Sequence, residues 1–199
     1  MIFIDSVDII ESDRLRDCPF TIPMLKDLTV FFGMNGTGKT TILEAMRREG
    51  SKKIFGTKVK LNFTNKVEMK KTEIYSMFQK ELSHVKHDFN LYTDGMLGAW
   101  DVMNSFNSAG ERSRNQLDTV KKVENSVFFI DEMDSSLDWK GQKTYFNMLK
   151  RMSKTNQIFV STHSVIFCAM AGVVYDVGER RWSDFNMLKE TYKLPKKFV

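Results

Sequence analysis

Short apolar runs, each followed by a polar or glycine-containing segment, give this 199-residue chain its main pattern. Residues 127–130 are four consecutive apolar residues, which predicts a central parallel strand buried on both faces. Residues 157–163 predict another apolar strand, and the run 28–30 predicts a third that leads through a loop into a helix at 42–46. Strands and helices in this order predict an α/β domain with a mostly parallel sheet flanked by helices.

Two further segments alternate between polar and apolar residues. In the segment 58–63, Lys58 and Lys60 fall on one face of a strand and the apolar residues on the other. This alternation predicts a small antiparallel β subdomain with a solvated outer face. Residues 73–78 also alternate, and Gln79 stands at the end of that run.

A glycine-rich loop at residues 33–38 joins the predicted strand at 28–30 to the helix. Its glycines let successive backbone N–H groups turn inward, and the helix start adds unpaired donors, so the loop is a phosphate-binding P-loop. Lys39 supplies a positive charge for the β and γ phosphates, and Thr40 is placed to bind Mg²⁺. The predicted nucleotide-binding residues here are Asn35, Gly36, Thr37, Gly38, Lys39, Thr40 and Thr41.

An acidic pair, Asp131 and Glu132, follows the buried run 127–130. The carboxyl end of a parallel strand delivers side chains to the ligand crevice, which predicts Asp131 in the Mg²⁺ shell. Glu132, one residue further, is predicted to be the general base for an attacking water. Two acids after a strand also occur in ordinary turns, but the P-loop upstream favours the metal and base roles.

Two more segments extend the predicted site. His163 ends the predicted strand 157–163 at the same sheet edge, where a histidine is a candidate γ-phosphate sensor. The segment 107–111, Asn-Ser-Ala-Gly-Glu, precedes a polar stretch of helical character and predicts a second anion cradle. One chain has no use for two cradles on the same phosphate.

Together these motifs resemble the ABC-type ATPases. The signature sequence of that superfamily is matched by 107–111 with two substitutions, and 135–138 resembles its D-loop. The resemblance implies an ABC-type ATPase head as the fold. The residues that it adds to the site are Ser108 and Gly110 for nucleotide, Gln79 for Mg²⁺, and His163 as the switch histidine.

A closer resemblance covers almost the whole chain. It is carried by the segments 19–23, 28–33, 161–164 and 171–176. These look like the small stand-alone ATPases of the RecF/SMC-like branch. Met133 departs from that branch, which generally has proline there. The resemblance implies a homodimer clamped head to tail on ATP binding, in which Ser108 and Gly110 of one protomer face the nucleotide held by Lys39 of the other.

The segment 80–107 is too short for the coiled-coil arms of SMC proteins, and short for the helical subdomain of transporter subunits. We therefore expect one ATPase domain over residues 1–199, without either insertion. Cys18 and Cys168 are far apart and predict reduced core thiols rather than a disulfide or a zinc site. We find no apolar run of membrane length and no leader sequence, so we expect a cytoplasmic protein without membrane contact.

Charge adds one candidate partner. The chain carries 30 basic and 25 acidic residues, and the segment 52–71 contains seven lysines against one acid. A lysine stripe on a sheet binds DNA phosphates without reading sequence, although a merely solvated face is the alternative. The lysines predicted to contact DNA are Lys58, Lys60, Lys66 and Lys70.

The predicted function is ATP binding and hydrolysis with Mg²⁺ at a dimer interface. The leading hypothesis for its role is an ATP-gated switch or clamp in DNA transactions, repair or phage-host conflict. A nucleotide-bound scaffold that regulates a partner effector protein is an alternative. The energising subunit of a membrane transporter is another, against which the short segment 80–107 argues.

Overall fold

The computed structural model describes residues 3–47, 56–64, 73–78, 124–132, 134–135 and 137–194. None of the helices in these ranges is long and apolar enough to cross a membrane. The elements are, in chain order, β1 (Ile4–Glu11), β2 (Phe20–Ile22), β3 (Leu28–Phe32), α1 (Lys39–Arg47), β4 (Lys58–Phe63), β5 (Glu73–Phe78), β6 (Ser126–Asp131), α6 (Trp139–Met152), β7 (Gln157–Thr162), α7 (Val165–Ala171), β8 (Val173–Asp176), β9 (Arg181–Asp184) and α8 (Phe185–Thr191).

The main sheet has six strands in the order β5-β6-β7-β3-β8-β9, and all neighbours are parallel except the β8–β9 hairpin. In the centre, Val160 of β7 pairs with Val30 of β3 and with Ile130 of β6. The carboxyl ends of these three strands therefore meet at one edge of the sheet. This confirms the predicted mostly parallel sheet and brings together the segments that carry the candidate site.

A second, antiparallel sheet has the order β2-β1-β4. Its inner face is apolar, with Val7 of β1 paired to Leu61 of β4. On its outer face Lys60 is exposed opposite Asp8. The small antiparallel subdomain and the outward lysines are thus confirmed. The outer face also carries acids, because Asp8 lies opposite Lys60 and Glu11 opposite Lys58.

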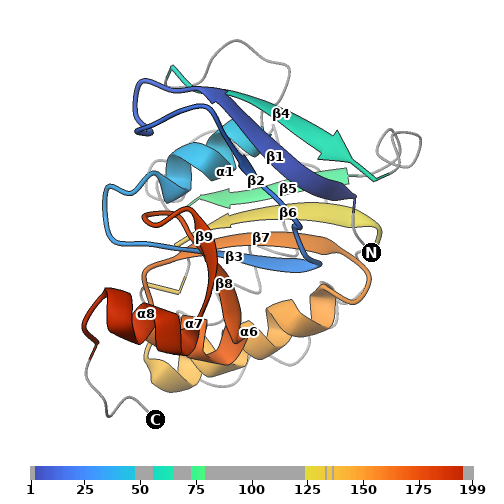
Figure 1. The fold of residues 1–199 in the computed structure, drawn as a ribbon. Helices are drawn as coiled ribbons and strands as arrows, with labels where there is room; N and C mark the ends of the chain where they lie inside the picture. The colour runs from blue at the N-terminus through green and yellow to red at the C-terminus, as the bar shows by residue number, and fades with distance from the viewer. Residues whose placement is uncertain are drawn as a thin grey trace, which may run out of the picture.

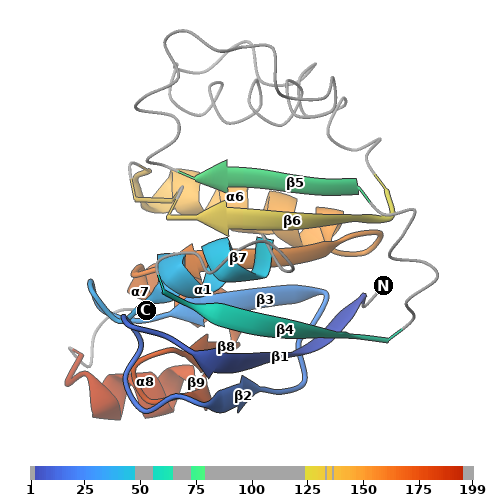
Figure 2. The ribbon, with the colours of Figure 1, turned by 90° about the horizontal axis from the view of Figure 1, so that it is seen from above.

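Two apolar cores lie on opposite faces of the main sheet, because successive residues of each strand point to opposite sides. From β6, Phe128 and Ile130 join one core with α6, α7 and α8, whereas Val127 and Phe129 join the other with α1 and the small sheet. Figure 1 shows α1 between the two sheets, and α6, α7 and α8 on the opposite face of the main sheet. Figure 2 views the molecule from the side of the small sheet.

The two predicted thiols differ in burial. Both cysteines are free, and Cys168 is buried in the core beside α6 and α8. Cys18 is half-buried at the margin of the other core, so it is less enclosed than the sequence predicts. It lies in the mostly exposed loop between β1 and β2.

A buried glutamine attaches the small sheet to the main one. The side-chain Oε1 of Gln157, at the start of β7, accepts hydrogen bonds from the backbone N–H groups of Phe3 (3.0 Å) and Ile4 (2.8 Å). Its Nε2 donates to the carbonyl oxygen of Ile4 at 2.8 Å. Because Gln157 has no exposed surface, these bonds replace the water that the start of β1 would otherwise need.

Candidate functional site

The loop between β3 and α1 has the backbone that the glycine pattern predicts. Gly36 and Gly38 have φ angles of 82° and 99°, values that side chains with a Cβ rarely adopt. A Cβ on Gly38 would also come within 2.0 Å of the Leu15 side chain, and one on Gly33 within 2.5 Å of Thr37 Oγ1. The glycines therefore permit a tight turn directly before the helix.

Lys39 is the first residue of α1, and its side chain is buried beneath this loop. Its Nζ donates to the carbonyl oxygens of Gly33 (2.9 Å) and Met34 (3.3 Å). It also forms an ion pair of 3.1 Å with Oε1 of Glu132, which follows β6. The ammonium group is thus aimed at the space between the loop and β6.

Thr40 and Asp131 are in contact, as the predicted metal site requires. Thr40 Oγ1 donates to the Asp131 carboxylate at 2.9 and 3.0 Å, and Ser161 of β7 donates to the same carboxylate. Burial raises the pKa of the Asp131 carboxyl above its ordinary value, while the hydrogen bonds from Ser161 and Thr40 act in the opposite direction.

A hydroxyl beside a carboxylate offers the oxygen ligands that Mg²⁺ prefers. Among the described residues there is no group of three or more His, Cys, Asp or Glu side chains that could hold a metal ion. This donor set fits Mg²⁺ that completes its shell with water and phosphate oxygens, as is usual in nucleotide sites.

Glu132 and His163 come from the ends of neighbouring strands. Glu132 has a φ of 51°, in the left-handed region, and its N–H donates to the carbonyl oxygen and to Oγ of Ser161, both at 3.1 Å. Its side chain is 24% exposed, and Oε1 lies 3.8 Å from Nδ1 of His163, whose side chain is 46% exposed. Two half-open side chains, one after β6 and one after β7, thus lie beside each other, and that of Glu132 also contacts Lys39.

Not every predicted residue joins this cluster. Thr41 lies in the first turn of α1 with its side chain buried. Lys58 and Lys60 lie on the outer face of the small sheet, away from the β6 and β7 ends. The predicted residues outside the described ranges are Gln79, Ser108, Gly110, Lys66 and Lys70.

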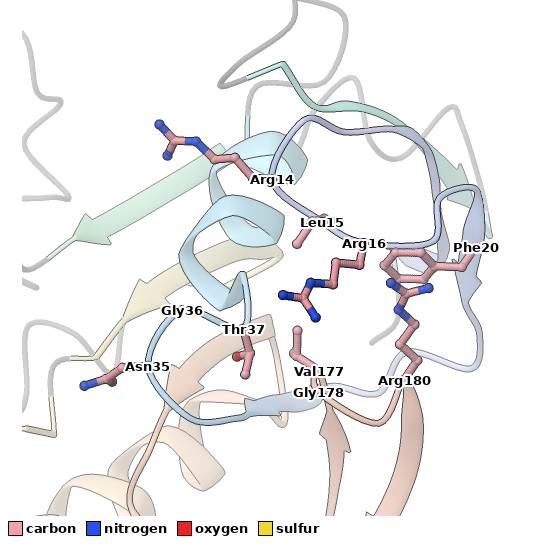
Figure 3. A pocket seen from close by; sticks show the side chains of 10 residues that line it. All are labelled: Arg14, Leu15, Arg16, Phe20, Asn35, Gly36, Thr37, Val177, Gly178 and Arg180. Atoms are coloured by element: carbon pink, nitrogen blue, oxygen red, sulfur yellow. The ribbon is translucent and has the colours of Figure 1, made fainter.

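A cavity of about 310 Å³ adjoins the P-loop at Asn35, Gly36 and Thr37. On its rim, the guanidinium of Arg180 lies 4.3 Å from the ring centroid of Phe20. Figure 3 shows the Arg16 side chain reaching into this space, whereas Arg14 extends away from it.

This cavity could not be predicted from sequence patterns, because its lining comes from three separate segments. The loop after β1 contributes Arg16, and the turn between β8 and β9 contributes Arg180. Arg180 is fixed there by a 2.8 Å hydrogen bond to the carbonyl oxygen of Asp17 and a 3.5 Å ion pair with its carboxylate. No single segment carries a signal for such an arrangement.

Asp134 is a second feature of the site that was not predicted from the sequence. Its side chain is 2% exposed and accepts a 2.6 Å hydrogen bond from Thr162 Oγ1. Burial raises the pKa of the Asp134 carboxyl, against the effect of that bond and of nearby His163. An acid two residues after Glu132 was a possible signal in the sequence.

Comparison with known proteins agrees with this geometry. Residues 29–180 match the model of a family described as the ATPase family associated with various cellular activities (AAA). A comparison with curated proteins found no match.

Two solved structures are similar in fold. One is the ADP conformation of MJ1267, an ATP-binding cassette of an ABC transporter, with a TM-score of 0.53, 16% identity and coverage of 98% of this chain and 96% of that one. The other is cbiO1 from Clostridium perfringens, part of the ABC transporter complex cbiONQ, with a TM-score of 0.52, 17% identity and coverage of 97% and 92%. They confirm the predicted ABC-like P-loop fold, and the narrower RecF/SMC-like resemblance stays a prediction.

Proposed function

Because this chain belongs to the AAA family of P-loop ATPases, we propose that it binds ATP with Mg²⁺ between the P-loop and β6 and hydrolyses it. One observation carries the proposal: Lys39, the Thr40–Asp131 pair and Glu132 converge at the carboxyl edge of the main sheet. An ammonium group, a pair of oxygen ligands and a carboxylate base are the parts that phosphoryl transfer to water requires.

Each of these side chains has a distinct role. The backbone N–H groups of the loop and Lys39 bind the β and γ phosphates, and Thr40 with Asp131 would hold Mg²⁺. When bound, Mg²⁺ neutralises charge on the phosphate oxygens. Glu132 orients a water and accepts its proton, and His163 contacts the γ phosphate. The two bonds from the Glu132 N–H to Ser161 fix the backbone that carries this carboxylate.

We assign the cavity beside Asn35, Gly36 and Thr37 to the ribose and base of the nucleotide. It is continuous with the P-loop, and the stacked Arg180 and Phe20 present a flat surface at its rim. A planar base packs well against such a surface, because guanidinium and aromatic groups both stack. We expect adenine there.

Hydrolysis at a head-to-tail homodimer is the assembly that we favour, with Ser108 and Gly110 of one protomer at the nucleotide of the other. The resemblance of 107–111 to the ABC signature supports it.

For the biological role we keep an ATP-gated switch or clamp in DNA transactions, repair or phage-host conflict. DNA would contact Lys58 and Lys60, together with Lys66 and Lys70. On the described outer face, however, Lys60 pairs with Asp8 and Lys58 with Glu11, which lowers the local positive charge. This observation weakens the support for DNA contact at Lys58 and Lys60 and leaves regulation of a partner effector protein as the alternative.

A transporter role finds less support. The two similar cassettes belong to ABC transporters, but they show a common fold alone at 16% and 17% identity. The segment 80–107 is short for a subdomain that grips membrane partners.

The proposed function is tested by nucleotide binding and phosphate release. The wild type should bind Mg-ATP and release phosphate, and Lys39→Ala should lose both activities because its charge contacts the β and γ phosphates. Lys143→Ala, at an exposed position of α6, is the matched control and should behave like the wild type. A wild type that neither binds nor hydrolyses ATP contradicts the proposal.

A further inference from the structure

The loops that follow β6 and β7 are joined by one amide side chain. Gln142, in the first turn of α6, donates from Nε2 to the carbonyl oxygens of Leu137 (3.1 Å) and Asp134 (3.4 Å), both in the loop after β6. Its Oε1 accepts a 2.6 Å hydrogen bond from Ser164, which follows β7. We call these three contacts the Gln142 bridge.

A second link runs parallel to the bridge and is buried. Thr162 Oγ1 donates to the Asp134 carboxylate at 2.6 Å and accepts from the N–H of Ser164 at 2.8 Å. Since Asp134 is 2% exposed, water does not substitute easily for its bond with Thr162. The loops after β6 and β7 are therefore held to each other by side chains at two places.

Each of these loops carries one of the half-open groups of the site. Glu132 begins the first loop, and its carbonyl oxygen accepts from the N–H of Ser135 at 3.2 Å. His163 lies between Thr162 and Ser164 in the second loop. A displacement of one loop relative to the other would change the 3.8 Å separation between Glu132 and His163. Misplacement of reacting groups by about 1 Å costs on the order of 10²-fold in rate.

We propose that Gln142 is a positioning residue, whose bridge keeps Glu132 and His163 in the mutual arrangement that ATP hydrolysis needs. The proposal rests on the proposed ATPase function for its catalytic consequence. It does not involve nucleotide binding, because the bridge contacts neither the P-loop nor the Thr40–Asp131 pair. Gln142 therefore affects turnover and leaves the affinity for ATP unchanged.

Two substitutions separate hydrogen bonding from packing. Gln142→Leu replaces the amide with an apolar side chain of similar size and loses all three bonds. Gln142→Glu keeps the length and the acceptor for Ser164, but it loses both donors and sets a carboxylate against the carbonyl oxygens of Leu137 and Asp134. Lys143→Ala is the control, because the neighbouring Lys143 is exposed on the same helix.

The first measurement compares kcat with ATP affinity. Both Gln142 variants should lower kcat by about 10-fold or more. The dissociation constant for Mg-ATP, from a direct binding titration, should stay within about twofold of the wild type. Gln142 variants with wild-type kcat, or with equal losses in kcat and affinity, overturn the proposal. A wild type without phosphate release indicates failure of the proposed function instead.

A second measurement works without any turnover. Hydrogen–deuterium exchange at the backbone amides of residues 132, 134, 135 and 137 and of 163–168 should speed up together in both Gln142 variants, and not in Lys143→Ala. Faster exchange along the whole of α6 would indicate general destabilisation and would overturn the positioning role. Unchanged exchange in both loops would overturn it as well.

Discussion

At the scale of single residues, the 3.1 Å ion pair between Lys39 and Glu132 joins the phosphate-binding group to the proposed base. Glu132→Gln removes the proton acceptor and the charge, but leaves Lys39 and the loop N–H groups to bind phosphate. We expect turnover to fall by a factor of about 10² or more with ATP affinity retained. Phosphate release and nucleotide titration measure the two effects, and equal turnover in both proteins would remove Glu132 from its role.

The proposed metal site can be tested through the effect of Asp131 on the stability of the folded protein. Its folded-state pKa is raised, so the folded protein binds a proton at this carboxyl more readily than the unfolded chain does. Stability therefore falls as the pH rises from about 4 through the raised pKa, and the cost of burying the charge persists at neutral pH.

Asp131→Asn removes that cost and keeps hydrogen-bonding atoms beside Thr40 and Ser161. We expect the nucleotide-free variant to melt at a higher temperature than the wild type at pH 7, with the difference shrinking near pH 4. Added Mg-ATP should stabilise the wild type more than the variant, because the carboxylate ligand is lost. A lower melting temperature without nucleotide at pH 7 would contradict this account.

At the scale of elements, the attachment of β1 to the main sheet depends on Gln157. Gln157→Leu keeps the volume but leaves the N–H groups of Phe3 and Ile4 and the Ile4 carbonyl without partners. We expect the free energy of unfolding to fall by about 3 kcal/mol or more. Urea titration measures it, with the exposed Asn147→Leu of α6 as the control. A loss no larger than in this control would mean that the small sheet is held by its apolar core alone.

The outer face of the small sheet decides between DNA and a protein partner. If it binds DNA, Lys58→Glu with Lys60→Glu should weaken duplex binding equally for every sequence. The affinity of the wild type should fall with salt at a log-log slope of about −0.9 per neutralised phosphate. A matched pair, Lys150→Glu with Lys154→Glu at exposed positions of α6 and the turn after it, should have little effect.

The measurement is a gel shift at low salt, together with phosphate release in the presence of duplex. A wild type that neither binds DNA nor is stimulated by it would indicate that these lysines only form a solvated face. The partner effector then becomes the leading hypothesis, in agreement with the acids opposite Lys58 and Lys60.

At the scale of the whole molecule, the proposed dimer is tested with a protein that binds ATP without consuming it. In sedimentation experiments, Glu132→Gln should convert from monomer to dimer on addition of Mg-ATP. Ser108→Arg in the same background should block this conversion by its bulk, and ADP should not support it. A Glu132→Gln protein that stays monomeric at saturating Mg-ATP would reject the signature assignment for this chain acting alone.

Local patterns account for the parts of the fold and site that could be predicted from the sequence. The buried strands β6 and β7 follow from continuous apolar runs, β4 follows from alternation, and the P-loop follows from glycine spacing. Asp131, Glu132 and His163 lie at one edge of the sheet because each directly follows or ends such a strand, and parallel strands end at a common edge.

Contacts between distant segments were decided by the tertiary structure alone. Gln157 reads as an ordinary strand start, yet its partners are about 150 residues away. The stack of Arg180 on Phe20 and the bond from Gln142 to Ser164 also join residues from different elements. A sequence determines which faces are apolar and where a chain turns, because those depend on neighbouring residues. Which polar side chains meet depends on strand order and helix packing, and those are set by the burial of both cores together.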